Sequence, residues 1–133
     1  MEEPRFKPEQ FIRRSGTAQV DAEVRRWLRS LTVAQRINFI VDLYSHNYRY
    51  AVALVRSSKL PSDDVTRLLQ QWLLSSSHNA SRGLIEGFVP MIGESRFWTI
   101  AAKSKVTPTM AEFLNFHGQE KLNLYRAALT EKA

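Results

Sequence analysis

The chain has 133 residues, the length of one ordinary domain, and its 44% hydrophobic and 24% charged residues exclude disordered and collagen-like classes. It contains no cysteine, which excludes disulfide frameworks, thiol catalysis and cysteine-ligated metal centres. Basic residues outnumber acidic ones by 19 to 13, and the net charge of +6 favours an acidic partner such as nucleic acid, an anionic membrane surface or an acidic protein. The longest apolar run, residues 51–55, is too short to cross a membrane, and the acidic start does not resemble a signal peptide. We therefore expect a cytoplasmic protein without a transmembrane segment.

Residues 1–16 are predicted to form a flexible N-terminal tail, because Pro4 and Pro8 interrupt a stretch that is crowded with charges. Residues 17–133 are predicted to form a single all-α domain. No segment in that range shows the sustained alternation and turn signals of paired strands.

Two helical segments are predicted before residue 60. Thr17 is a candidate N-cap for the first, which carries an apolar stripe with the spacing of one helix face: Val20, Val24, Trp27, Leu28 and Leu31. Thr32 and Gln35 have the spacing of a capping box at the start of the second. That segment is either one helix from 33 to about 56 or two helices, with a break at 45–47 and Asn47 as the second cap.

Helical spacing continues through the second half of the chain. We expect helices from Ser62 to the turn at 75–79, over 80–91, over 96–103, and from an N-cap at Thr107 to about 128. The predicted fold is a compact bundle of five to six helices.

Helical hairpins are a candidate building unit of this bundle. The tripeptide Ser-His-Asn occurs at 45–47 and again at 77–79, and apolar positions around it match at the same offset of 32 residues. That offset is in the length range of helical-repeat units. The alternative is that two amphipathic hairpins share their spacing by chance.

The sequence does not provide the groups that an active site needs. No nucleophile, base and oxyanion donors can be assembled, and no phosphate-binding loop is present. His46, His78 and His117 lack metal-ligand spacing, and His117 falls on the apolar stripe of the last helix, where a core histidine is expected. We predict no enzymatic activity, no catalytic residues, no metal and no cofactor.

Arginines form the densest basic patch, between residues 13 and 36. One interpretation is a stripe that contacts phosphates without reading bases, and the other is a solvated helix face on which Asp21 neutralises Arg25. The candidate contacts to phosphate or to an acidic partner are Arg13, Arg14, Arg25, Arg26, Arg29 and Arg36.

Apolar residues outside the main helix stripes are candidate interface positions. Phe39 and Leu43 make their helix apolar on two sides, so it is either central in the bundle or part of a subunit contact. Tyr50 is expected to be exposed beside two arginines, a composition typical of interfaces. Gly83 and Gly87 share one helix side, where small residues let another helix approach closely.

These observations favour a non-enzymatic helical protein-interaction module, acting as an adaptor, regulator or assembly factor, whose partner is another protein or a second copy of the chain. The alternative is a basic helical nucleic-acid-binding domain that contacts phosphates through the arginine patch. Self-association that persists at high salt would favour the first, and loss of nucleic-acid binding on neutralising Arg25, Arg26 and Arg29 would favour the second.

Overall fold

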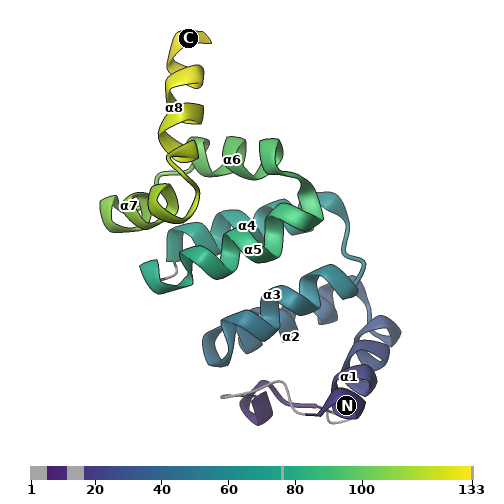
Figure 1. The fold of residues 1–133 in the computed structure, drawn as a ribbon. Coiled ribbons are helices and arrows are strands. Elements are labelled where there is room, and N and C mark those ends of the chain that lie inside the picture. The colour runs from purple at the N-terminus through teal and green to yellow at the C-terminus, as the bar shows by residue number, and fades with distance from the viewer. Residues whose placement is uncertain (1–5, 12–16, 76, 133) are drawn as a thin grey trace. The chain divides into compact units, whose positions relative to one another are not determined.

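A computed structural model describes residues 6–11, 17–75 and 77–132, which form helices and turns without a strand (Figure 1). The all-α class is confirmed. Within the described ranges there are eight α-helices and two short 3₁₀ helices, so the prediction of five to six helices is too low. The chain groups into two compact units, Met1–Leu60 (unit 1) and Pro61–Ala133 (unit 2), a division that the sequence does not predict.

Unit 1 contains the 3₁₀ helix η1 (Pro8–Phe11) and the helices α1 (Ala18–Ser30), α2 (Val33–His46) and α3 (Tyr48–Ser57). The caps that the sequence predicts at α1 and α2 are confirmed. The Thr17 hydroxyl accepts a hydrogen bond from the backbone N–H of Val20 at 3.2 Å, and Thr32 and Gln35 form both bonds of the capping box.

Asn47 separates α2 from α3, so the two-helix alternative is the one observed. Its backbone is not helical, and its side-chain Oδ1 accepts a hydrogen bond from the N–H of Tyr50 at 3.1 Å. Its Nδ2 donates to the carbonyl of Phe11 at 2.9 Å and so ties η1 to the break. Phe11 is buried against the ring of Tyr50, with ring centroids 5.3 Å apart. Residues 6–11 of the predicted tail therefore pack on the rest of unit 1.

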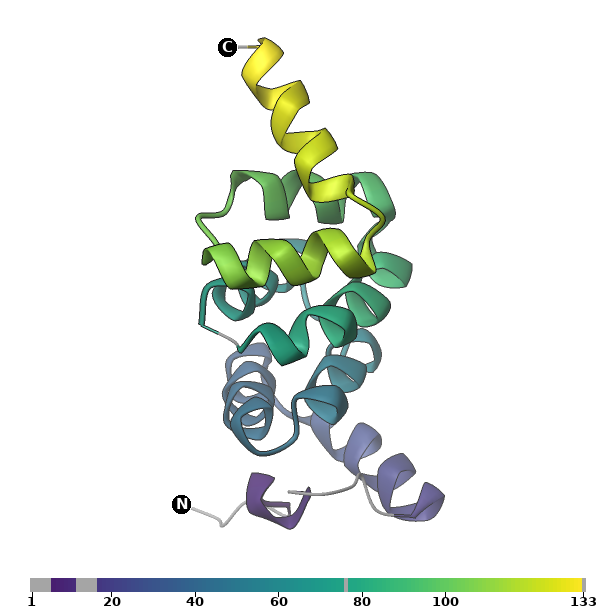
Figure 2. The ribbon, with the colours of Figure 1, turned by 60° about the vertical axis from the view of Figure 1, so that its left-hand side comes forward.

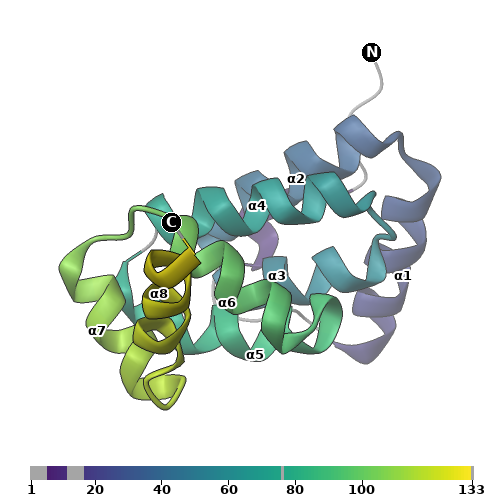
Figure 3. The same cartoon turned by 90° about the horizontal axis from the view of Figure 1, so that it is seen from above.

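Unit 2 contains α4 (Ser62–Ser75), the 3₁₀ helix η2 (His78–Ala80), α5 (Ser81–Ile92), α6 (Glu94–Lys103), α7 (Pro108–His117) and α8 (Lys121–Lys132). Helix α5 contacts α4, α6 and α7, and α8 packs on α6 and the end of α7 (Figure 3). The largest core side chains are aromatic: Trp72, Phe88, Phe97 and Trp98. The predicted N-cap Thr107, followed by Pro108 in the first turn, is confirmed.

The prediction of a single helix from Thr107 to about residue 128 is wrong, because the structure has two helices there, α7 and α8, with a break between them. Gln119 and Glu120 both have positive φ, and the buried Asn115 uses its Oδ1 to accept from the N–H of Asn123 at 3.0 Å. The Asn115 Nδ2 also donates to Asn123 Oδ1 at 3.1 Å. After this break α8 begins against α6 and the end of α7 and then extends away from them (Figure 2).

Candidate functional site

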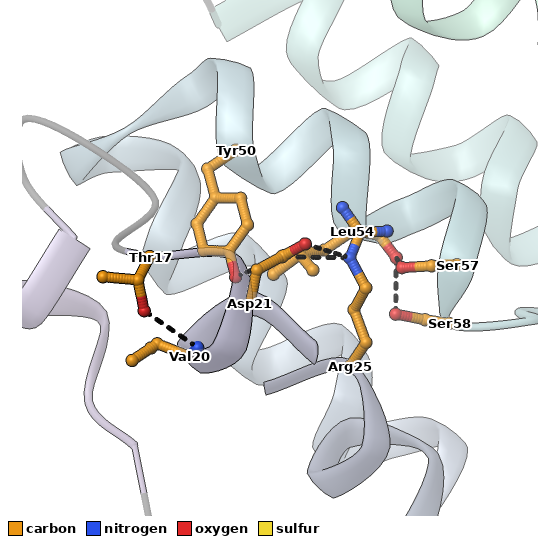
Figure 4. Close-up of polar contacts among 8 residues, drawn as sticks. All are labelled: Thr17, Val20, Asp21, Arg25, Tyr50, Leu54, Ser57 and Ser58. Carbon is orange, nitrogen blue, oxygen red and sulfur yellow. Dashed lines mark hydrogen bonds and ion pairs between the residues drawn. The ribbon is translucent and has the colours of Figure 1, made fainter. Parts of the chain in front are cut away.

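Arg25, a candidate phosphate contact, is already paired within unit 1. Its Nε lies 2.9 Å from each carboxylate oxygen of Asp21, one helical turn earlier on α1. The hydroxyl of Tyr50 donates to the same carboxylate at 2.8 Å, so the pair also links α1 to α3 (Figure 4). The Asp21 carboxylate therefore neutralises the Arg25 guanidinium, which supports the solvated-face interpretation at this position.

Tyr50 is buried, with 5% of its surface exposed, so the expectation of an exposed interface tyrosine is wrong. Burial raises the pKa of its hydroxyl, and the hydrogen bond to Asp21 and the charge of that carboxylate raise it further. Phe39 and Leu43 are also buried, and the Phe39 ring packs edge-on against Trp27 with centroids 5.0 Å apart. These positions of α2 match the interpretation of a central helix rather than of an exposed subunit contact.

Arg36 binds three backbone carbonyls within unit 1. Its guanidinium donates to the carbonyl of Leu31 at 3.0 Å, to that of Arg29 at 3.0 Å and to that of Ser58 at 2.9 Å. These carbonyls close the C-terminal ends of α1 and α3, where helical C=O groups lack partners within their own helix. Arg36 is therefore a structural cap, and three of its five N–H donors are bound to carbonyl groups of the chain itself.

The other candidate residues have three different outcomes. Arg26 and Arg29 are exposed on α1. Arg13 and Arg14 lie outside the described residues. Gly83 and Gly87 are half-buried on α5, the helix that contacts three others in unit 2.

Four rings on unit 2 form a cluster that the sequence does not predict, here called the aromatic–histidine row. It consists of His78 in η2 and Phe113, Phe116 and His117 on α7. The ring centroids of His78 and Phe113 lie 4.5 Å apart, those of Phe113 and His117 6.3 Å, and those of Phe116 and His117 5.1 Å. His117 is exposed, so the expectation of a core histidine is wrong. Spacing alone could not show this, because Phe113 and His117 share the apolar side of a predicted helix.

The large exposed apolar side chains lie in unit 2, whereas most of the net positive charge lies in unit 1. Within the described residues the large exposed apolar side chains are Phe116, Leu124 and Leu74, at 77%, 68% and 52%, and all three belong to unit 2. Unit 1 has eleven basic and six acidic residues, a net charge of +5, whereas unit 2 has eight and seven, a net charge of +1.

Metal-ligating side chains do not gather in groups of three or more anywhere in the described ranges. None of the helices found there is long and apolar enough to span a bilayer. No protein-family model matches the chain, and no curated protein or solved structure matches it either.

Proposed function

We propose that the chain is a non-enzymatic protein-interaction module and that it binds a second copy of itself through the aromatic–histidine row. The observation that carries this proposal is the exposure of Phe116, which is 77% exposed and lies at the end of the row. A few well-desolvated residues supply most of the binding energy of a protein interface, and aromatic side chains are enriched at interfaces.

The row can supply part of the contact energy of a dimer. Complete burial of a phenylalanine side chain contributes about 1.5–3 kcal/mol, and a well-oriented aromatic pair adds about 0.5–1.5 kcal/mol. A twofold contact pairs the same patch of both copies, so Phe116 of both copies would be buried in one interface.

Charge favours a second copy as the occupant. A twofold contact brings identical patches together, and like charges around them would oppose it. Unit 2, which carries the row, has a net charge of only +1, whereas unit 1 has +5. Self-association through the row therefore brings unit 2 of one copy against unit 2 of the other, and unit 2 is the less charged of the two units.

Analytical ultracentrifugation of the whole chain tests this proposal, over a range of protein concentrations at 0.15 M and 1 M NaCl. We expect a monomer–dimer equilibrium that persists at 1 M NaCl, because an apolar contact is not weakened by charge screening. Phe116→Ser should raise the dimer dissociation constant at least tenfold. Leu124→Ser is the matched control, since it removes a similarly exposed apolar side chain from α8, outside the row.

Either of two results would refute self-association through the row. The first is a wild-type chain that stays monomeric at every concentration. The second is a dimer that Phe116→Ser weakens no more than Leu124→Ser does. Circular dichroism of both variants establishes that each retains its helices.

A further inference from the structure

The ends of two helices that are distant in sequence meet at Arg36 and bring a second set of basic residues together. Arg36 donates to the carbonyls of Arg29, in the last turn of α1, and of Ser58, directly after α3. Four exposed basic side chains lie near this junction, two on α1 and two at or just after the end of α3, and we refer to them as the basic end: Arg26, Arg29, Arg56 and Lys59.

Helix C-termini normally repel an anion, because their unpaired carbonyls carry partial negative charge. At the basic end the Arg36 guanidinium covers three of these carbonyls, those of Leu31, Arg29 and Ser58. Arg36 thus removes the main local obstacle to an anion at this junction.

The four side chains of the basic end have no acidic partner among the described residues. In the described part of the chain none of them forms an ion pair or a side-chain hydrogen bond. The nearby carboxylate of Asp21 is already occupied by Arg25 and Tyr50. Unit 1 as a whole has a net charge of +5.

We infer that the basic end binds the phosphate backbone of duplex nucleic acid without sequence preference. Guanidinium groups match phosphate geometry, and three of the four side chains are arginines. An acidic protein partner would call for an apolar interface core, but no large apolar side chain of the described part of unit 1 is exposed. Binding to single strands relies on stacked aromatic side chains, and the same observation disfavours it.

Four phosphate contacts predict a defined salt dependence. For B-DNA the slope of log K against log salt concentration is about −0.9 per contact, so four contacts give a slope of about −3.6. The affinity should then fall about 150-fold between 50 and 200 mM salt.

Fluorescence anisotropy of a labelled 20-base-pair DNA duplex, titrated with the whole chain from 50 to 200 mM NaCl, tests this inference. Arg29→Gln combined with Arg56→Gln should make the slope shallower by about 1.8, because two contacts are lost. The control is Arg67→Gln combined with Arg82→Gln, which removes the same charge from exposed arginines of unit 2 and should leave the slope unchanged.

Three outcomes would overturn the inference. The first is absence of saturable binding at 50 mM NaCl, and the second is a slope that the control pair reduces as much as the Arg29 and Arg56 pair does. The third is displacement of the duplex by poly-L-glutamate as effectively as by unlabelled duplex at equal charge concentration, which would assign the basic end to an acidic protein.

Discussion

Gly118→Ala should destabilise unit 2 through a specific steric conflict. A Cβ atom at position 118 would lie less than 3.0 Å from two ring carbons of Trp98, Cη2 and Cζ2, and 2.7 Å from the carbonyl oxygen of Leu114. Trp98 is 1% exposed and the carbonyl belongs to the last turn of α7, so neither group can move away freely. Overpacking in a core costs about 1–3 kcal/mol, and two rigid neighbours put this substitution near the upper end, at about 3 kcal/mol.

Gly93 provides a contrast, because it needs glycine for a different reason. Its φ is +93°, which disfavours any L side chain, but a Cβ there would meet nothing within 4 Å. Gly93→Ala should therefore cost about 1–3 kcal/mol through backbone strain alone. The two substitutions differ in their dependence on Trp98.

Urea unfolding followed by circular dichroism distinguishes the two mechanisms in a double-mutant cycle with Trp98→Phe. Phenylalanine lacks the outer ring atoms that conflict with residue 118, so Gly118→Ala and Trp98→Phe together should cost at least about 1 kcal/mol less than their sum. Gly93→Ala and Trp98→Phe should be additive within about 0.5 kcal/mol. Additivity in the Gly118 cycle would refute the steric explanation.

Two further predictions concern unit 1. Arg36→Met should lower the free energy of unfolding by about 2–4 kcal/mol in urea titrations, because three carbonyls lose a charged donor, whereas Arg26→Met should change it by less than about 0.5 kcal/mol. The raised pKa of Tyr50 means that the folded chain keeps a proton that the unfolded chain loses above about pH 10. Wild-type stability should therefore fall above that pH, by up to about 1.4 kcal/mol per pH unit, more steeply than that of Tyr50→Phe. Equal slopes for the two proteins in urea titrations from pH 9 to 11 would contradict this prediction.

Local chemistry explains which parts of the fold the sequence predicts. Thr17, Thr32 and Thr107 each cap a helix through an N–H three residues away, and that signal is contained in the sequence itself. The sequence leaves the break at Asn47 as one of two alternatives, because the cap on Tyr50 is local but the bond to Phe11 is not.

The break between α7 and α8 depends on contacts that sequence spacing does not reveal. Gly118 is needed because the indole of Trp98 approaches it, and Trp98 lies on another helix, 20 residues earlier in the chain. Asn115 supports the start of α8 by pairing with Asn123. Residues at helical spacing continue from α7 into α8, with His117 and Lys121 at two of the positions, so the spacing alone predicts a single helix.

Among the candidate site residues, the arginines also divide into those with a partner nearby in the sequence and those whose partners are distant in the sequence. Arg25 has its acidic partner one helical turn away, and the sequence identifies that pair. Arg36 binds carbonyls at the ends of two helices, and its nearest sequence neighbours give no sign of this role. The same contacts bring the end of α3, which carries Arg56, to the end of α1, which carries Arg29, and this approach could be recognised only in the folded unit.

Because most of the net positive charge lies in unit 1 and the exposed apolar side chains lie in unit 2, we expect nucleic-acid binding and dimerisation to respond differently to salt. Phosphate binding at the basic end weakens steeply as counterions compete, whereas burial of the row is insensitive to screening. Raising the salt concentration should therefore release a DNA duplex while the dimer persists. Arg29→Gln with Arg56→Gln should affect only the first response and Phe116→Ser only the second, when binding is measured below the dimer dissociation constant. A single surface responsible for both activities would instead lose both in either variant.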